Sequence, residues 1–288
     1  MGIAKILAPL TGGTRDGVVL SNAFAAAKLS NAHVAALFIR PDATEAVPFY
    51  GESTSASVMQ EIADATKEAS DVASRAARAT LFAAAKDACA MLVEQPTRSD
   101  KPTASYREVL GNFADRVTAA AHLSDLIVFG ALKEDDRPGL TEAFEATLVE
   151  TGRPVLLSAQ EAGISFCKKI TIAWNESAAA AHAASAALPF LKCATEVEIL
   201  AVLRKKDAPI DSSELKGYLR LHGVESTERS VDGGTRDIAE VLLTEASAGG
   251  ASLLVAGGYG HSRLREMFIG GVTRKVVSHA KLPVFLVH

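Results

Sequence analysis

The sequence predicts an α/β fold made of two tandem open-sheet domains. Apolar runs rich in β-branched residues alternate with alanine-rich, helix-forming segments along the whole chain of 288 residues. Several of these runs are continuous rather than alternating, which suits parallel strands that are covered on both faces. The pattern of five runs then occurs a second time. A repeat of about half the chain is too long for a solenoid unit, so it indicates two fused copies of one fold.

The first copy begins at the N-terminus and carries five predicted strands. They fall at residues 3–9, 33–39, 105–110, 125–130 and 154–157, and residues 17–29 form a predicted helix after the first. The copy also holds an insertion at about 41–100, with a loop over 41–55 and a long helix over 56–94. The alanine face of that helix predicts packing against a neighbouring helix, and a partner or dimer surface is the alternative. This face includes Ala69, Ala73, Ala76 and Ala77.

The second copy has the same order of elements. Its predicted strands are residues 169–174, 196–203, 225–231, 252–257 and 283–287, with a helix over 178–191 after the first of them. Asp237 is expected to cap a later helix. The apolar pattern is interrupted at 158–166 by Gln160, Glu161 and Gly163. We therefore expect one domain over residues 1–160 and a second over 165–288.

Composition narrows the class of protein. A net charge of −4 and a pI near 6.0 argue against nucleic-acid binding as the main task. No apolar run reaches the length of a membrane span, and the first residues resemble a buried strand rather than a signal peptide, so we expect a cytoplasmic protein that does not bind membranes. Cys89, Cys167 and Cys193 show neither metal nor disulfide spacing and are expected to be small buried hydrophobic residues.

The most informative motif is a glycine-rich loop after the strand at 252–257. Gly257, Gly260 and Gly270 lie between this strand and a helix-like segment that starts near residue 273. Glycines allow close approach of the backbone to an anion, and a helix start offers free N–H groups. His261, Arg263 and Arg265 add positive charge beside the loop. The arrangement predicts a phosphate site.

These residues resemble the nucleotide loop of universal stress proteins, whose pattern is G-x2-G-x9-G-[S/T]. The resemblance extends to the opening and closing strands of both copies, at residues 5–10, 153–155, 169–175 and 282–284. It implies five parallel strands in the order 3-2-1-4-5 in each domain, with a ligand at the point where the strand order reverses. It also implies ATP or a related adenine nucleotide, and it leaves the presence of Mg²⁺ open.

Carried over by position, the resemblance implies a nucleotide site in the second copy. The base and ribose would contact Ala173, Trp174, Asn175 and Val202. The phosphates would contact Gly257, Gly260, Gly270, Gly271 and Val272, with His261 and Arg263 nearby. The only tryptophan of the chain could stack on the base, but packing under the loop is the favoured interpretation.

Two positions depart from the family pattern. The usual Asp after the first strand is Asn175, which can donate and accept hydrogen bonds but has no charge. The usual Ser or Thr after the last glycine is Gly271, which keeps the backbone N–H and loses a hydroxyl. One lost hydrogen bond costs about 0.5–1.5 kcal/mol, so we expect weaker binding rather than none.

The first copy is expected to lack the site. At the corresponding place it has Glu134, Asp135 and Asp136. Thr141 stands at the position of Gly270 and is followed by Glu142. Acidic side chains repel a polyphosphate, and side chains obstruct close backbone approach. The same run is also compatible with a solvated loop.

The resemblance as a whole implies a tandem universal stress protein that binds adenine nucleotide in its second domain and acts in a stress response or in signalling. The two domains are expected to pair through their last strands, and a further homodimer is left open. The alternatives are a scaffold with a remnant loop and, third, a nucleotide-dependent enzyme. No catalytic or metal-binding constellation is expected, because the sequence has no Walker lysine, nucleophile elbow or metal-ligand spacing.

Overall fold

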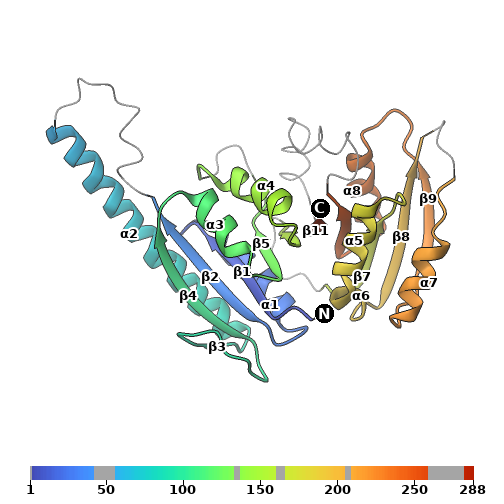
Figure 1. Cartoon of the computed structure of the whole chain (residues 1–288), viewed down its shortest axis with the longest axis horizontal. Coiled ribbons are helices and arrows are strands. Elements are labelled where there is room, and N and C mark those ends of the chain that lie inside the picture. Colours follow the sequence, from blue (N-terminus) through green and yellow to red (C-terminus); the bar gives the residue numbers. More distant parts are fainter. Residues whose placement is uncertain (1, 42–55, 133–136, 160–165, 205–208, 259–281) are drawn as a thin grey trace.

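The fold is a single eleven-stranded sheet with helices on both faces, described here from a computed structural model (Figure 1). The structure describes residues 2–41, 56–132, 137–159, 166–204, 209–258 and 282–288. The strand order is β3-β4-β2-β1-β5-β6-β11-β10-β7-β8-β9. The first half of the chain therefore forms one end of the sheet and the second half forms the other.

All ten predicted strands are present, and they form two similar halves. Those of the first half are β1 (Lys5–Leu10), β2 (His33–Arg40), β4 (Thr103–Leu110), β5 (Leu126–Phe129) and β6 (Val155–Leu157). Those of the second half are β7 (Lys169–Ala173), β8 (Glu196–Leu203), β9 (Thr227–Asp232), β10 (Leu253–Gly257) and β11 (Val284–Val287). Numbered along the chain within each half, these strands lie in the order 3-2-1-4-5.

The two halves meet at the only antiparallel pair among the described strands. Val284 of β11 pairs with Leu157 of β6, and Leu286 pairs with Val155. All other strand pairs are parallel, as expected for strands joined by helical crossovers. The last strand of each half thus closes the edge of the other.

Helices cover both faces of the sheet. One face carries α1 (Asp16–Ala27), α2 (Ala56–Asp87), α5 (Ala178–Ala186), α6 (Leu188–Leu191) and α7 (Ser213–Leu221), whose buried side chains belong to one hydrophobic core. The other carries α3 (Phe113–Ala121), α4 (Leu140–Glu150) and α8 (Ile238–Ala248) over a second core. Each core contains residues from both halves, so apolar packing continues across the junction.

Three details differ from the sequence predictions. The long helix α2 ends at Asp87 rather than at 94, because Cys89 adopts a left-handed φ of 56° and the chain then forms a short extra strand, β3 (Met91–Leu92). The predicted helix 178–191 is divided into α5 and α6, since Pro189 in the first turn of α6 lacks a backbone donor.

The third difference concerns the cysteines. Cys167 and Cys193 form a disulfide with a Cα–Cα distance of 5.0 Å, and Cys89 is exposed. The prediction of three buried, unpaired cysteines was therefore wrong. The two paired residues precede the neighbouring strands β7 and β8, whose parallel register sets Lys169 opposite Glu196. Strand pairing brings the cysteines together, and their spacing in the sequence does not reveal it.

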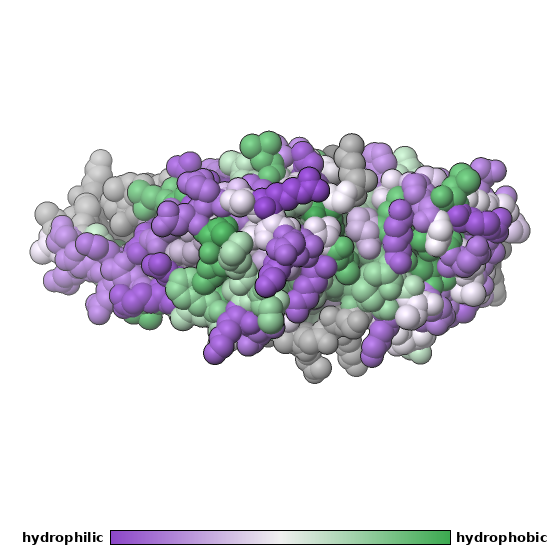
Figure 2. Space-filling view, turned by 90° about the horizontal axis from the view of Figure 1, so that it is seen from below, coloured by the Kyte–Doolittle hydropathy of each residue, from purple (hydrophilic) through white to green (hydrophobic). Residues whose placement is uncertain are grey.

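Hydrophilic residues dominate the surface in Figure 2, where hydrophobic residues form small separate patches. Within the described part of the chain, no helix combines the length and the apolar character that a membrane crossing requires.

Candidate nucleotide site

The candidate site lies at the carboxyl ends of β7, β8 and β10. These strands are parallel neighbours, with Ala173 opposite Leu200 and Ile172 opposite Val255, so their ends lie along one edge of the sheet. Five of the predicted contact residues lie at this edge: Ala173, Trp174, Asn175, Val202 and Gly257. Gly260, His261, Arg263, Gly270, Gly271 and Val272 lie outside the described residues.

Gly257 lies so close to the backbone of α5 that a side chain at this position would clash with it. A Cβ built on Gly257 would lie 2.5 Å from both the carbonyl carbon of Ala179 and the amide nitrogen of Ala180. The last residue of β10 is thus packed against the first turn of α5, and a side chain would separate the two. This contact brings the start of the glycine-rich segment to the positive end of a helix.

The first turn of α5 is organised by Asn175 and Ser177. The carboxamide oxygen of Asn175 accepts hydrogen bonds from the amide (3.3 Å) and the hydroxyl (2.7 Å) of Ser177. Ser177 in turn caps the helix by accepting from the amide of Ala180 at 3.2 Å. The exposed Asn175 therefore already has a role in shaping the turn after β7.

Trp174 is half-buried and packs against the core next to α7. Its indole N–H donates to the carbonyl oxygen of Asp211 at 3.1 Å, and its amide donates to Leu200 at 2.9 Å. Packing under the glycine-rich loop was the favoured prediction for this residue, and that loop lies outside the described residues. The contacts that the structure shows are with the β8–α7 connection and with β8. The indole lies at the candidate site but is tied to the segment that precedes α7.

Glu176 and Asp211 are two residues at this edge that sequence reasoning missed. The carboxylate of Glu176 accepts a hydrogen bond from the amide of Asp211 at 3.1 Å, and the backbone of Glu176 has a left-handed φ of 58°. Asp211 accepts from the amide (2.8 Å) and the hydroxyl (2.5 Å) of Ser213, and these bonds lower the pKa of its carboxyl group. Only the Asp-Ser-Ser run at 211–213, typical of a helix start, signals this arrangement in the sequence.

The corresponding edge of the first half is filled by its own side chains. Asp16 is buried, and its carboxylate accepts hydrogen bonds from the amide of Thr11 (3.0 Å), the hydroxyl of Thr11 (3.1 Å) and the amide of Gly12 (2.8 Å). Burial raises the pKa of Asp16. The backbone donors after β1 are thus used by an internal carboxylate.

Arg137 occupies the neighbouring space. Its guanidinium donates to the carbonyl oxygen of Ile39 at 2.6 Å and lies 4.8 Å from the ring centre of Phe113 and 5.7 Å from that of Phe38. Burial lowers the pKa of this guanidinium, and the charge of Asp16 opposes that effect. A cation therefore stacks on aromatic rings at the end of β2.

Helix α2 completes the closure of this edge. A Cβ on Gly12, which has a φ of 79°, would lie 2.5 Å from the carbonyl oxygen of Ala73. The inserted helix thus lies directly on the loop after β1. At the end of β2, Arg40 pairs with Asp71 of α2 and with Glu108 of β4.

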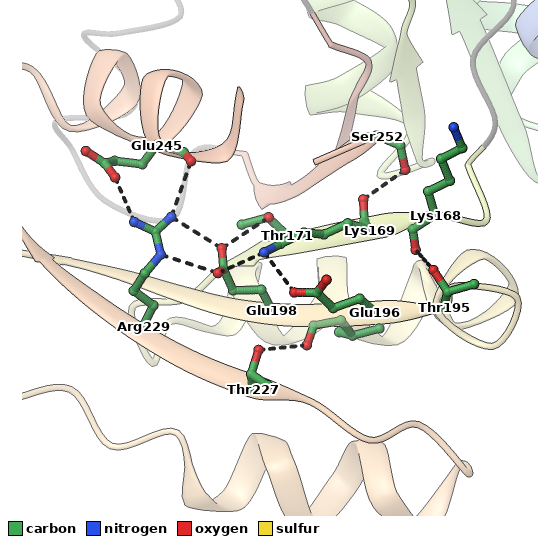
Figure 3. A network of polar contacts seen from close by, with 11 residues as sticks. Lys168, Lys169, Thr171, Thr195, Glu196, Glu198, Thr227, Arg229, Glu245 and Ser252 are labelled. Carbon is green, nitrogen blue, oxygen red and sulfur yellow. Dashed lines mark hydrogen bonds and ion pairs between the residues drawn. The ribbon is translucent and has the colours of Figure 1, made fainter. Parts of the chain in front are cut away.

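A separate polar network holds β7, β8, β9 and α8 together (Figure 3). Glu198 is buried and pairs with Lys169 at 3.2 Å and with Arg229 at 3.3 Å, and Arg229 also pairs with Glu245 at 2.7 Å. Burial would raise the pKa of Glu198, but the hydrogen bonds from Arg229 and Lys169 outweigh it and lower the pKa below the usual range. In the strand register Glu198 lies beside Thr171, two residues before the end of β7, and Arg229 lies in line with Leu200 and Ala173. The network thus ties these three strands to α8 beside the candidate site.

Within the described residues, no group of three His, Cys, Asp or Glu side chains is arranged to hold a metal ion.

A family comparison agrees with this architecture. Residues 167–288 match the model of the universal stress protein family. This match lies within the second half of the chain. Among curated protein sequences, none matches this chain well enough to count as a relative.

Solved structures extend the fold likeness to the whole chain. A universal stress protein from Archaeoglobus fulgidus DSM 4304 is similar with a TM-score of 0.66 and 16% identity, over 98% of this chain and 95% of the other. A putative universal stress protein from Pseudomonas aeruginosa UCBPP-PA14 has a TM-score of 0.54 and 15% identity, over 99% and 93%. At this identity the likeness concerns the fold.

Proposed function

We propose that this chain is a tandem universal stress protein that binds ATP or a related adenine nucleotide in its second half and serves as a stress-response or signalling module. The domains of the proposal span residues 1–160 and 165–288. The first is a structural or partner-binding half. The protein acts in the cytoplasm, and no hydrolytic step is part of the proposal.

The proposal rests on a contrast between the two halves, at the edge of the sheet where the carboxyl ends of their strands lie. In the first half, Asp16 takes the backbone donors, Arg137 stacks at the end of β2 and α2 lies on Gly12. In the second half, the equivalent edge ends in Gly257, whose lack of a side chain allows contact with the start of α5. An anion at that edge would meet a helix N-terminus and a glycine-rich backbone.

The base and ribose contacts in this proposal come from Ala173, Trp174, Asn175 and Val202. The phosphate contacts come from Gly257, Gly260, Gly270, Gly271 and Val272, and His261 and Arg263 supply positive charge. Mg²⁺ would be bound through the phosphates, since no metal ligand set is proposed for the protein itself.

The antiparallel pair of β6 and β11 supports intramolecular pairing of the two domains. Covalent fusion raises the effective concentration of one half around the other, so neither has to find a separate partner.

Thermal unfolding with and without nucleotide tests the proposal. ATP, alone and with Mg²⁺, should raise the free energy of unfolding by about 2.7 kcal/mol at one hundred times its dissociation constant. The Gly260→Asp variant should lose this gain. Gly217→Asp is the matched control, because the space around Gly217 on α7 is open, and it should keep the full gain. An equal gain in Gly260→Asp would contradict the proposed phosphate loop.

A scaffold that binds no nucleotide is the second candidate. The observation that favours it is the engagement of the Asn175 carboxamide with Ser177, which leaves this group less available for a ligand. If neither ATP, ADP nor AMP stabilises the protein, and no adenine nucleotide is found by mass spectrometry in protein purified without added ligand, this candidate replaces the first.

A further inference from the structure

The outer face of α2 has an apolar character that packing against the other described residues does not explain. Helix α2 has 32 residues, which corresponds to a length of about 48 Å. Its inner face is buried through Ser74, Ala77, Leu81 and Ala85. From 57 to 69, none of the side chains that the structure describes is buried. In Figure 1 the N-terminal turns of α2 extend past the sheet, at the end of the molecule far from the second half.

The exposed side of this helix carries a regular apolar seam. Consecutive members are four, three, four, three and four residues apart, which is the spacing that keeps side chains on one side of a helix facing a second helix. All members are exposed, and they lie on the side opposite the buried face. The seam consists of Ala65, Ala69, Val72, Ala76, Ala79 and Ala83.

Larger apolar side chains extend this surface. Val72 is 54% exposed and Phe82, beside the seam, is 42% exposed. Exposed large hydrophobic residues gathered on one element are typical of an interaction surface.

The charges along α2 indicate what covers the seam. Between residues 61 and 68 the helix has three acids and one lysine, a net charge of −2. Between residues 75 and 87 it has three bases and one acid, a net charge of +2. Asp71, between these segments, is already paired with Arg40. A second α2 in antiparallel orientation would set each acidic segment against a basic one, and a parallel partner would set like charges together.

We propose that α2 is a self-association surface, on which a second copy of this chain docks its own α2 in antiparallel orientation. The small seam residues allow the two helices to approach closely, at the short end of the usual 8–10 Å. A pair centred near residue 71 places Glu68 of one copy close to Arg75 of the other, twice by symmetry. The interface is one helix wide, below about 1,200 Å² in total, so the dimer is weak and reversible. This proposal does not depend on nucleotide binding.

Sedimentation of the full chain over a range of concentrations tests the proposal. The wild type should pass from monomer to dimer as concentration rises. Val72→Glu should weaken the dimer at least tenfold, because it buries a charge in the seam. Val149→Glu is the matched control, since Val149 is 47% exposed on α4 of the same half, and it should leave the dimer unchanged. Circular dichroism should show both variants folded.

Charge exchange tests the orientation. Glu68→Arg and Arg75→Glu should each weaken the dimer, and the double variant should restore it. A wild type that stays monomeric at all concentrations, or a dimer that Val72→Glu leaves intact, would overturn the proposal. Failure of the double variant to recover would overturn the antiparallel arrangement.

Discussion

Trp174 lies at the candidate site, and its side chain connects the end of β7 to the segment before α7. Because it is the only tryptophan, its fluorescence reports on this edge alone. We expect saturable changes in its emission on titration with ATP, as nucleotide alters the environment of the ring. The Gly260→Asp variant should show no such change at the same concentrations. Equal changes in both proteins would indicate binding elsewhere.

Glu198 shows how one buried carboxylate can serve stability. Its pKa in the folded protein is lowered, so the ionised form stabilises the fold above the unfolded pKa, and this contribution is lost as pH falls through the lowered value. Glu198→Gln should reduce the free energy of unfolding by about 1–3 kcal/mol at pH 7, since Arg229 and Lys169 lose a charged partner. The deficit should shrink as pH falls from about 4.3, the ordinary pKa of Glu, through the lowered pKa of the folded protein.

Urea unfolding at several pH values measures this effect. Glu196→Gln is the control, because Glu196 pairs with the same Lys169 but is 51% exposed. Exposed pairs contribute at most about 1 kcal/mol, so this variant should differ little from the wild type. A deficit in Glu198→Gln that does not vary with pH would argue against the network as its cause.

At the scale of elements, the Cys167–Cys193 disulfide joins the segment before β7 to the segment after α6. It closes a sequence separation of 26 residues, for which the loss of unfolded-state entropy corresponds to about 3.5 kcal/mol. The double variant Cys167→Ser/Cys193→Ser should lose about this much stability under oxidising conditions. Cys89→Ser should lose none, because Cys89 is exposed and unpaired.

Unfolding in the presence of a thiol reductant distinguishes the effect of losing the disulfide from the effect of replacing the two side chains. The wild type should then fall to the level of the double variant, while the variant itself should not change. Reducing surroundings favour the dithiol, so we expect lower stability there than under oxidising conditions. If reductant leaves the wild type unaffected, the bond does not form in solution.

The cap of α8 is an element-scale feature that could be predicted from the sequence. Asp237 accepts hydrogen bonds from the amides of Ala239 at 2.9 Å and Glu240 at 3.3 Å. This local signal needs no knowledge of distant residues. The end of α2 at Asp87, just before the left-handed Cys89, and the two-residue strand β3 could not be predicted in the same way, because β3 depends on pairing with β4.

At the scale of the whole molecule, the two unequal edges predict one nucleotide per chain. Isothermal titration calorimetry with ATP should give a stoichiometry of one. Arg137→Ala should leave this number unchanged, because α2 and Asp16 still close the first edge, and it should lower stability through the loss of the stacked guanidinium. Two equivalent sites would contradict the asymmetry.

The overall architecture could be predicted because hydrophobic periodicity and the repeated element order are local patterns. The alternating strands and helices, the ten main strands and the long helix were all visible in them. The closure of the first edge by Arg137 and Asp16 could not be predicted in this way. Arg137 bonds to the backbone of the distant residue Ile39, and Asp16 accepts from the backbone amide of Gly12, which no side-chain pattern reveals. The sequence attributes the expected loss of a site there to the acidic residues 134–136, which lie outside the described residues.

The short length of β3 and the charged composition of β9 have a consequence for how this protein behaves at high concentration. These two strands are the outermost ones of the sheet. One offers a hydrogen-bonding rim of only two residues, and the other carries Glu228, Arg229 and Asp232. Neither rim is a good template for adding further chains, so a sheet this wide can remain finite instead of growing into fibrils.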